Sequence, residues 1–490
     1  MSRLQDWCFL TTLCRDEHEP YFPADGDGYS SCEYFRRSSL REVQGFWRKT
    51  AGLIRAGRAP RDLGLYLHWP FCPSRCAFCF CSMAVPRSAS EMRAYARGLE
   101  REMEAFRGPL EGLPFTSVYL GGGTPTFIPD ELLDGLLSRL RRSFTLAEGA
   151  EVYAEASPAT LTKAKLDILR RHGVDRLTLG VQSLDPKVLS FGRRPGQTAA
   201  SVARAVRMVR EVPGIYSGVE LMYGLEGQTP RSFLRDVVAV MKLGPDGVYL
   251  YGFDARPQTL FARAGKRLPP RVREEQLRMP GLLDKLARLY GYRPPSHHPD
   301  APEYMSTISR QCRAARRSGA SILGLGAGAL SHAFGSAWYR HPPIEESSRA
   351  WGGLPPFTCL ESPPAEEMRG YAVRHLYTQG ELSRRGFREL FGKDPLAVPA
   401  LARPLRGLAS LGKLSIGAGL IAFKTQDRAQ RVVFSKSLYS PGLERRLMEA
   451  HRAEHRDFLR RHPESSLKDL GPAADRRVAA LMTTFERTRK

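Results

Sequence analysis

The chain has 490 residues, far more than one average domain, so we expect a large core with at least one appended unit. Hydrophobic residues make up 42% and charged residues 26%, which excludes disordered, collagen-like and low-complexity proteins. Lysine and arginine total 74 against 51 acidic residues, and only 13 of these cations are lysine. The arginine excess suits a phosphate or carboxylate ligand, but without a long basic block it indicates a solvated surface and assigns no partner.

The first thirty residues contain acidic side chains and no sustained apolar run, so the sequence predicts no secretory signal. No window approaches the ~18 consecutive apolar residues that a membrane span requires. We therefore expect a cytoplasmic protein without a membrane span.

Residues 1–60 show no regular apolar period, and the DGDGYSSCEYFRRSS stretch within them is typical of a loop. We expect this segment to be an irregular N-terminal extension that covers the mouth of the core domain. The core domain itself begins with the next apolar run.

From Leu63 onward, short apolar runs alternate with longer amphipathic segments, which is the pattern of βα units around a parallel sheet. The predicted strands are Leu63–Trp69, Thr116–Leu120, Glu151–Glu155, Arg176–Gln182, Ser217–Tyr223 and Asp246–Phe253. The predicted helices between them are Ser90–Phe106, Asp130–Arg142, Thr160–His172, Gln197–Arg210 and Pro230–Leu243. Right-handed crossovers would close these units into an α/β fold, a full or partial (β/α) TIM-like barrel with its chemistry at the carboxyl ends of the strands.

The remaining chain is predicted to complete the barrel and to add a C-terminal domain. For the completion of the barrel, the predicted elements are a helix from about Arg271 to Tyr290, one glycine-rich strand over Ser321–Phe334 and a linker at Pro355–Glu367. For the C-terminal domain, they are helices at Glu367–Gln379, Glu381–Phe391 and Val398–Leu411, short strands around Leu414–Phe423, and a basic helix at Gly442–Arg461. This divides the chain into an extension (1–60), the core barrel (61–260), its completion and linker (261–365), and a helical, winged-helix-like domain (366–490). Because no cluster of base-reading residues accompanies that domain, we do not expect it to bind nucleic acid.

Four of the nine cysteines lie within ten residues, directly after the first predicted barrel strand: Cys72, Cys76, Cys79 and Cys81. This clustering, with an odd total and no signal peptide, indicates metal binding or redox chemistry rather than a disulfide framework. A zinc knuckle is the structural alternative. Zinc sites prefer two separated cysteine pairs or added histidines, and neither accompanies this cluster, so the spacing predicts an iron–sulfur centre.

Further motifs follow the cysteines in order along the predicted barrel. They are YLHWPFC (Tyr66–Cys72), GGGTPT (Gly121–Thr126), GVQS (Gly180–Ser183), GR (Gly192–Arg193), LMYGLEGQT (Leu221–Thr229) and GLGAGALS (Gly324–Ser331). In this combination the sequence resembles the radical S-adenosylmethionine (SAM) enzymes, and within them the oxygen-independent coproporphyrinogen III oxidase-like family, which is related to the two-SAM class C radical methylases. The resemblance runs from about Leu63 to Phe253 and includes GLGAGALS.

The resemblance implies that Cys72, Cys76 and Cys79 bind a 4Fe–4S cluster and leave one iron open for the amino and carboxylate groups of SAM. One electron from the reduced cluster would cleave SAM to methionine and a 5'-deoxyadenosyl radical, which abstracts a substrate hydrogen. The residues that the resemblance places against SAM are Tyr66, Gly122, Gly123, Thr124, Glu155, Gln182, Arg193, Glu220 and Ala255. It implies one SAM molecule or two, an electron donor such as flavodoxin or ferredoxin, and no particular catalytic residue.

Several residues near these motifs have no assigned role. Phe78 and Phe80 flank the cluster cysteines and either shield the cluster or simply pack in the core. Cys81 matches an additional cysteine of coproporphyrinogen oxidases that is not a cluster ligand. We interpret His297 and His298, in a proline-rich loop, as solvated. Tyr292, Tyr304 and His332 stay unassigned.

The leading activity that the resemblance implies is radical oxidation and decarboxylation of a carboxylated tetrapyrrole. Two alternatives stay open: a two-SAM radical methylase or cyclopropanase acting on an sp2 carbon of an aromatic substrate, and a haem-binding chaperone. The N-terminal sixty residues lack the R-Y-T-x-Y-P run that coproporphyrinogen oxidases carry near their substrate, and Glu19–Tyr29 matches it only loosely. Where the family usually has aspartate, this sequence has Glu220.

Overall fold

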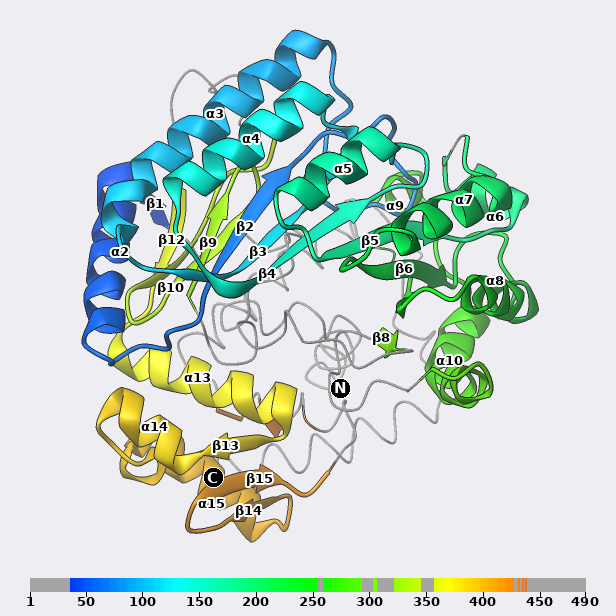
Figure 1. The fold of residues 1–490 in the computed structure, drawn as a ribbon. Coiled ribbons are helices and arrows are strands. Elements are labelled where there is room, and N and C mark those ends of the chain that lie inside the picture. The colour runs from blue at the N-terminus through cyan, green and yellow to red at the C-terminus, as the bar shows by residue number, and fades with distance from the viewer. Residues whose placement is uncertain are drawn as a thin grey trace.

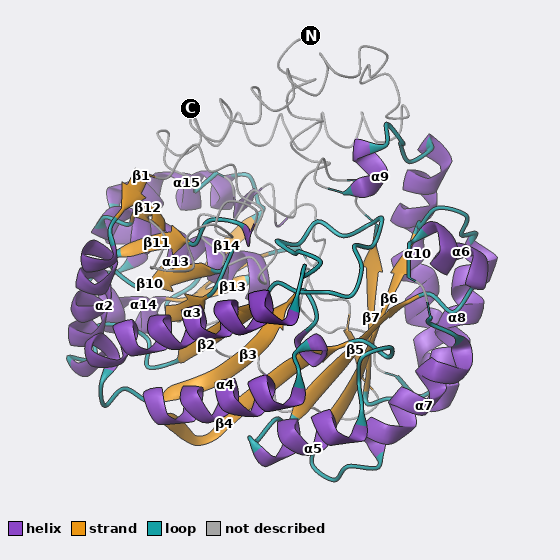
Figure 2. Ribbon diagram, turned by 90° about the horizontal axis from the view of Figure 1, so that it is seen from above, coloured by secondary structure: helices purple, strands orange, loops and turns teal. Residues whose placement is uncertain are grey.

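A single curved sheet with helices on its outer side organises the molecule (Figures 1 and 2). The computed structural model describes residues 36–194, 196–253, 255, 259–292, 303–305, 321–344, 357–425, 431, 434–435 and 437–438. The order of its twelve strands is β1-β12-β11-β10-β9-β2-β3-β4-β5-β6-β7-β8. Because β1 and β8 are the two edges of this sheet, the described residues form a partial barrel rather than a closed one.

Seven neighbouring strands of the sheet are parallel. They are β9 (Ser321–Leu325), β2 (Leu63–Trp69), β3 (Phe115–Gly122), β4 (Leu146–Ala156), β5 (Arg176–Gln182), β6 (Tyr216–Tyr223) and β7 (Gly247–Gly252). The six strands predicted from the apolar runs are thereby confirmed. Buried parallel strands read as apolar runs because helices cover their outer face, which explains why the sequence pattern locates them well.

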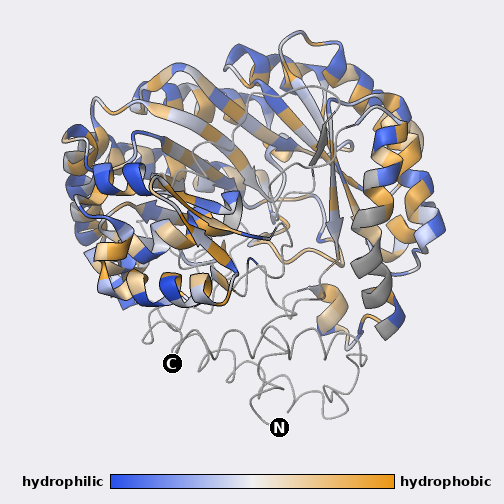
Figure 3. Ribbon diagram, turned by 90° about the horizontal axis from the view of Figure 1, so that it is seen from below, coloured by the Kyte–Doolittle hydropathy of each residue, from blue (hydrophilic) through white to orange (hydrophobic). Residues whose placement is uncertain are grey.

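Six helices that connect the parallel strands lie where the sequence predicts them. They are α3 (Ala89–Arg107), α4 (Asp130–Ser143), α5 (Lys163–Arg171), α7 (Ala199–Arg210), α8 (Pro230–Leu243) and α10 (Pro270–Leu289). Two short helices, α6 (Pro186–Phe191) and α9 (Leu260–Arg263), were not predicted. Figure 3 shows that they carry both hydrophilic and hydrophobic residues. None of the helices within the described ranges is long and apolar enough to cross a membrane.

Helix α4 shows how the sequence pattern produces this packing. Leu133, Leu136, Leu137 and Leu140 repeat at intervals of three and four, and each is at most 3% exposed. This spacing places them on one helix face, which packs against the sheet. Burial of each leucine contributes about 1.5–3 kcal/mol, so the face holds the helix in place.

The expectation of an irregular chain up to residue 60 is wrong for Leu40–Arg55, which forms helix α2. Ser39 caps this helix, and its side chain and that of Glu42 bond reciprocally to the backbone at its first turn. Trp47 is fully buried and its indole donates a 2.7 Å hydrogen bond to the Tyr339 hydroxyl. Residues 1–35 lie outside the described residues, so the cover over the barrel stays a prediction, as do the domain boundaries.

The glycine-rich segment after α10 is a hairpin and not the single strand predicted. It consists of β9 and β10 (Leu330–Ala333), which pair antiparallel. Their connection turns back at residues 326–329, where the chain has little side-chain bulk. Two further antiparallel strands, β11 (Ala337–Arg340) and β12 (Phe357–Glu361), extend the sheet toward β1 (Arg36–Ser38).

The linker predicted at Pro355–Glu367 is also wrong in part, since β12 occupies its centre. The Phe357 and Cys359 side chains are buried there, at 0% and 1% exposure. At the other end of the sheet, β8 (Glu303–Met305) pairs antiparallel with β7. The predicted helix at 442–461 lies outside the described residues.

The C-terminal domain is confirmed as helical with a small sheet. Its elements follow in the order α13 (Pro364–Gln379), β13 (Glu381–Ser383), α14 (Arg384–Phe391), α15 (Pro399–Ser410), β14 (Leu414–Ile416) and β15 (Leu420–Phe423). Strands β13, β15 and β14 form a separate three-stranded antiparallel sheet. This element order is that of a winged helix.

A buried carboxylate fixes α13 to the antiparallel strands. Glu367 is 2% exposed. Its carboxylate accepts hydrogen bonds from the His332 ring at 3.1 Å and from the Arg374 guanidinium at 2.9 Å. It also accepts from the Ser362 hydroxyl and the Gly335 amide, each at 3.1 Å. Burial alone would raise the pKa of this carboxyl, but His332 and Arg374 hold it well below its usual value. His332, unassigned from sequence, therefore has a structural role here.

Glu367→Gln should lower the free energy of unfolding by about 3–5 kcal/mol, because Arg374 would stay buried without its anion. Glu366→Gln is the matched control, since Glu366 is partly exposed and its ion pair with Arg369 is 3.6 Å long. Thermal unfolding of both variants measures the difference, and equal melting temperatures would contradict the role of Glu367.

The same group predicts a pH dependence. A carboxyl with a lowered folded pKa stabilises the fold fully above its unfolded value of 4.5, and this contribution is lost as the pH falls below that value. The wild-type melting temperature should therefore fall more steeply below about pH 4.5 than that of Glu367→Gln. If the melting temperatures of the two proteins fell equally with pH, Glu367 would not be the source of the acid sensitivity.

Candidate functional site

All four clustered cysteines lie in a closed loop that follows β2. The loop leaves the sheet at Cys72 and returns at Ala84, where the Cys72 amide donates to the Ala84 carbonyl at 3.1 Å. The Ala84 amide in turn donates to the Pro70 carbonyl at 2.9 Å. These two hydrogen bonds fix the base of the loop, so Cys76 and Cys79 are presented from a defined position at the carboxyl end of the strand.

Loops from neighbouring strands hold the cysteine loop in place. The Ala77 amide donates to the Gly192 carbonyl after α6 at 3.0 Å, and the Ala77 carbonyl accepts from the Phe261 amide of α9 at 2.9 Å. From the other side, the Thr124 hydroxyl lies 3.1 Å from the Cys72 sulfur. The loops after β2, β3 and β5 therefore meet around the cysteines.

Burial dominates the electrostatics of these thiols. The pKa of Cys72 is raised to about 12, mainly by burial and also by the neighbouring Cys79 and Cys76, while the Thr124 hydrogen bond opposes the rise. Burial also raises the pKa of Cys76, against the opposing charge of Arg194. Thiolates here need a bound cation, because burying an unpaired negative charge is costly.

No three His, Cys, Asp or Glu side chains of the described residues lie close enough to hold a single metal ion. A 4Fe–4S cluster binds each cysteine through a different iron, so its ligands need not meet at one point. Three half-buried cysteines, with an arginine beside Cys76, suit a multi-iron cluster whose cysteine ligands carry negative charge. Cys81 is half-buried in the same loop, and its role stays open.

An arginine that the sequence interpretation passed over lies beside the cysteines. Arg194 Nη1 is 3.6 Å from the Cys76 sulfur, and its Nη2 donates to the Gly180 carbonyl at 2.5 Å and to Gln197 Oε1 at 3.0 Å. Gln197 is itself fixed by a 2.7 Å hydrogen bond from its Nε2 to the Val181 carbonyl. The guanidinium is therefore held rigidly at the carboxyl end of β5.

Arg193, the residue predicted from the GR motif, is exposed and ends helix α6 instead. Its φ of 55° is left-handed, so it turns the chain out of the helix and directs the next residue toward Cys76. The structure thus brings Arg194, and not Arg193, beside Cys76, while the predicted contact of Arg193 with SAM stays a prediction.

Arg194→Lys should reduce SAM cleavage about 10–100-fold, because lysine cannot reproduce the forked guanidinium contacts. Arg193→Lys, one residue away, should stay close to wild type. Turnover of SAM under chemical reduction measures both variants, and a larger loss for Arg193→Lys would reverse the assignment.

The glycine loop after β3 lies directly across the end of β2. The Gly123 amide donates to the Trp69 carbonyl at 2.7 Å. A Cβ atom at Gly123 would come within 2.7 Å of the Pro70 carbonyl, and one at Gly122, whose φ is 114°, within 2.7 Å of the His68 ring. Only glycine fits at these two positions, so Gly122 packs against the His68 ring and Gly123 against the Pro70 backbone at the base of the cysteine loop.

A hydrogen-bond chain joins the barrel interior to the cysteine loop. Burial lowers the pKa of His68 to about 4, so the ring is neutral near pH 7. Its Nε2 lies 2.8 Å from the Ser82 carbonyl, which can only accept, and its Nδ1 lies 2.9 Å from the Tyr66 hydroxyl. The hydroxyl of Tyr66 therefore donates to Nδ1, which fixes the orientation of this predicted SAM-binding residue.

Glu155, at the end of β4, is oriented by a tyrosine that sequence reasoning missed. The Tyr119 hydroxyl donates to Glu155 Oε1. The Tyr119 ring stacks between Tyr66 and Tyr153, with centroid distances of 5.3 Å and 4.4 Å. Tyr119 precedes Gly121 by two residues, so strand alternation could have placed it on the same face as the glycine loop.

Tyr119→Phe should weaken SAM binding about tenfold, because it removes a hydrogen bond to a carboxylate while keeping the stacked ring. Tyr292→Phe is the control, since that hydroxyl donates to the Pro245 carbonyl in a remote buried site. Equilibrium binding of SAM to the reconstituted proteins measures the effect. An unchanged affinity for Tyr119→Phe would show that Glu155 needs no such support.

Gln182 and Glu220 approach each other over Gly180. A Cβ at Gly180 would be 3.1 Å from Gln182 Nε2 and 3.7 Å from Glu220 Oε2. The ladder between β5 and β6 shifts register at this point, and Gln182 has a left-handed φ of 68°. The buried Gln182 Oε1 accepts no hydrogen bond from any described residue. An amide in this state is suited to a polar ligand.

The last predicted contact, Ala255, lies on the cysteine side of the site. It packs with Cys76 against a small apolar cluster that contains Phe78 and Phe261. Phe78 is thus a core residue beside the cysteines, which agrees with its packing interpretation.

The structure brings all the predicted positions except Arg193 to the carboxyl ends of β2 to β7 or to the loops that follow them. The ligand roles of these residues stay predictions. His297 and His298, the Tyr304 side chain and Glu19–Tyr29 lie outside the described residues.

Comparisons with known proteins agree with this geometry. A sequence profile of the Radical SAM superfamily matches residues 66–238. The oxygen-independent coproporphyrinogen III oxidase of Paracoccus denitrificans is 35% identical over 209 residues, which cover 42% of this chain and 45% of the relative. The heme chaperone HemW of Mycobacterium tuberculosis is 32% identical over 220 residues, which cover 43% of this chain and 55% of the relative. The matches thus span about half the length of these curated relatives.

A solved structure resembles the chain over a longer stretch. Coproporphyrinogen III oxidase from Escherichia coli matches with a TM-score of 0.64 at 21% sequence identity, over 81% of this chain and 92% of that chain. At this identity the likeness shows the fold alone. The chain therefore contains a region, residues 66–238, that matches the Radical SAM superfamily, and it is similar over less than half of its length to oxygen-independent coproporphyrinogen III oxidases and to a heme chaperone.

Proposed function

We propose that the chain is an enzyme that binds a 4Fe–4S cluster through Cys72, Cys76 and Cys79 and cleaves SAM by one-electron reduction. The observation that supports this proposal is that the cysteine loop meets the glycine loop at Cys72 and Arg194 at Cys76, at one end of the barrel. The cluster would supply one electron to the sulfonium of SAM, giving methionine and a 5'-deoxyadenosyl radical that abstracts a substrate hydrogen.

The chain's own residues would bind and orient SAM. The backbone of Gly122 and Gly123 would border its methionyl end beside the cysteine loop, and Thr124 would flank it. Arg194 suits its carboxylate, because a guanidinium pairs bidentately with that group. The buried interior would exclude water from the radical.

The opposite side of the site carries acceptors for SAM. Glu155 and Glu220 would accept from its ammonium and ribose hydroxyl groups, and the Gln182 amide would bond to a polar edge. Tyr66 would line the same space, and Ala255 would pack near its adenosyl part. One SAM molecule would account for all these contacts. A second SAM molecule would lie on the side of the site that Gln182 and Ala255 form.

For the substrate we propose a tetrapyrrole with propionate side chains, oxidised by hydrogen abstraction next to a carboxylate. Identities of 35% and 32% with coproporphyrinogen III oxidases, over 42% and 49% of the chain, support this choice. Haem binding without turnover is the second candidate, because the heme chaperone is similar at nearly the same identity. An electron carrier such as flavodoxin or ferredoxin and a location in the cytoplasm complete the proposal.

Anaerobic reconstitution with iron and sulfide, followed by reduction with dithionite in the presence of SAM and coproporphyrinogen III, tests the proposal. Mass spectrometry should find 5'-deoxyadenosine together with a tetrapyrrole that has lost carboxyl groups. Formation of 5'-deoxyadenosine with unchanged tetrapyrrole would contradict the substrate, and accompanying S-adenosylhomocysteine would favour a methylase. Stable haem binding with no SAM cleavage would favour the chaperone.

A further inference from the structure

Four loops meet on the surface beside Cys76 and carry an unusual charge distribution. They are residues 72–81, 190–197, 224–228 and 259–268. The Gly192–Ala77 and Phe261–Ala77 hydrogen bonds join three of them. The fourth is joined by the 2.7 Å ion pair between Lys266 and Glu226.

The described side chains of these loops are mostly cationic. Their charged members are Arg75, Arg193, Arg194, Arg263, Lys266, Arg267 and Glu226. Glu226 is the single acidic residue among them, and it is paired with Lys266. Arg193, Arg263 and Arg267 are exposed. The surface therefore presents positive charge to solvent.

An apolar side chain lies among these cations. Phe191 is 41% exposed and is the one aromatic side chain among the exposed large hydrophobic residues of the described chain. Its ring packs over Gly227, where an added Cβ would be 2.7 Å from the ring, so it is held in position. An exposed aromatic residue on loops that carry several cations is typical of a protein docking site. The ring anchors the partner protein, and the charges steer its approach.

This surface also adjoins the cysteine loop directly. Phe191 precedes Gly192, whose carbonyl accepts a 3.0 Å hydrogen bond from Ala77, the residue after Cys76. A redox group held against Phe191 would be separated from the cysteine loop by one residue and one hydrogen bond.

We propose that this donor face, made of Phe191, Arg193, Arg263, Lys266 and Arg267, docks a small acidic one-electron carrier protein. The proposal rests on the proposed function, because reductive cleavage of SAM needs such an electron. In each turnover the reduced carrier loses one electron, which reaches the sulfonium and breaks its bond to the 5' carbon, while the carrier is oxidised by one equivalent.

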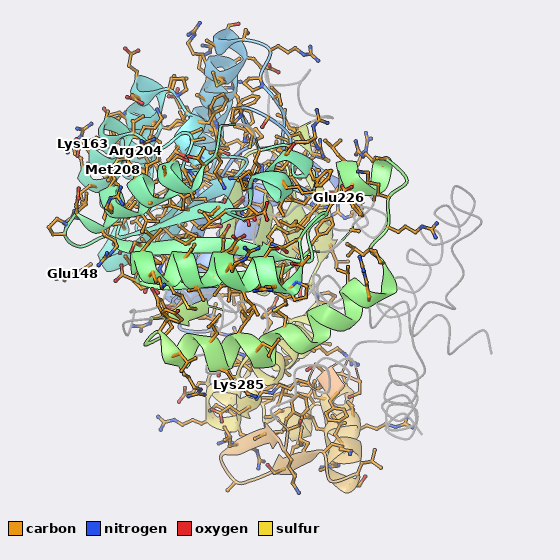
Figure 4. The ribbon with its side chains drawn as sticks, turned by 90° about the vertical axis from the view of Figure 1, so that its right-hand side faces the viewer. Glu148, Lys163, Arg204, Met208, Glu226 and Lys285 are labelled. Carbon is orange, nitrogen blue, oxygen red and sulfur yellow. The ribbon has the colours of Figure 1, made fainter. Side chains whose placement is uncertain are left out.

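The double variant Arg263→Glu/Arg267→Glu tests the donor face with reduced flavodoxin as the carrier. Its apparent KM for flavodoxin in 5'-deoxyadenosine formation should rise about tenfold or more at low salt, because attraction becomes repulsion. The rate with dithionite should stay unchanged. The control variant Arg204→Glu/Arg207→Glu alters two exposed arginines of α7, and Figure 4 shows Arg204 on the opposite side of the molecule from Glu226.

The outcomes separate docking from catalysis. If the KM for flavodoxin of Arg263→Glu/Arg267→Glu were unchanged, or if it rose equally in the control variant, the proposed docking at the donor face would be wrong. Failure of the wild type to form 5'-deoxyadenosine with dithionite would instead contradict the proposed function. Direct binding of flavodoxin to the immobilised wild-type protein and variants needs no turnover. Phe191→Ala should weaken that binding without changing its salt dependence, and unaltered binding would remove the aromatic anchor from the proposal.

Discussion

Cys76→Ala should abolish both the brown absorbance of the reconstituted protein and all cleavage of SAM. Cys76 is buried at the centre of the cysteine loop, with Arg194 3.6 Å from its sulfur, so neither water nor another described side chain replaces this ligand easily. Iron and sulfide content, the visible spectrum and 5'-deoxyadenosine formation measure the loss. A variant that keeps four irons and its activity would contradict the assignment.

Two other cysteines are matched controls for that experiment. Cys359→Ala removes a buried thiol in β12, remote from the site, and should affect stability alone. Cys81→Ala should keep the cluster, because three ligands leave one iron open for SAM. If Cys81→Ala loses iron as Cys76→Ala does, the cluster has four cysteine ligands and the proposed binding of SAM to iron is wrong.

Gly123→Ala should impair the site nearly as severely, although it changes no ligand. The added Cβ would be 2.7 Å from the Pro70 carbonyl carbon and oxygen, and backbone atoms cannot turn aside as a flexible side chain can. Relief of the clash costs about 1–3 kcal/mol and displaces the glycine loop from the base of the cysteine loop. SAM affinity should fall at least about tenfold, which corresponds to about 1.4 kcal/mol.

The control for this substitution is Gly135→Ala in the neighbouring helix α4. An added Cβ there meets nothing within 4 Å, so the change should raise stability by about 0.5–1 kcal/mol and leave SAM binding intact. Equilibrium dialysis of SAM against both reconstituted variants measures the contrast. Equal affinities in the two variants would mean that the glycine loop does not border the SAM site.

The parallel strands and their helices could be predicted from the sequence because their packing is periodic. Helix α4 repeats leucine at three and four residues, and β2 is an unbroken apolar run, so local pattern and burial coincide. Helix α2 carried a recognisable signal as well, in the capping box of Ser39 and Glu42. It was missed because the surrounding segment is rich in polar and turn-forming residues.

Other features depend on contacts that no local pattern encodes. Strand β12 is a five-residue segment between prolines, and only its pairing with β1 and β11 makes it a strand. The choice between Arg193 and Arg194 depends on a left-handed residue after α6, since a shift of one position moves the guanidinium from solvent to Cys76. Tyr119 was hidden for a similar reason, because its partner Glu155 lies on the next strand.

The central claim is that three cysteines hold a cluster with an iron that SAM can reach. Electron paramagnetic resonance of the anaerobically reduced, reconstituted protein, recorded with and without SAM, tests this claim most directly. We expect the signal of one reduced 4Fe–4S cluster for each chain, and a clear change of that signal when SAM is added. A cluster signal that SAM leaves unchanged, or a protein that binds zinc in place of iron, would contradict it.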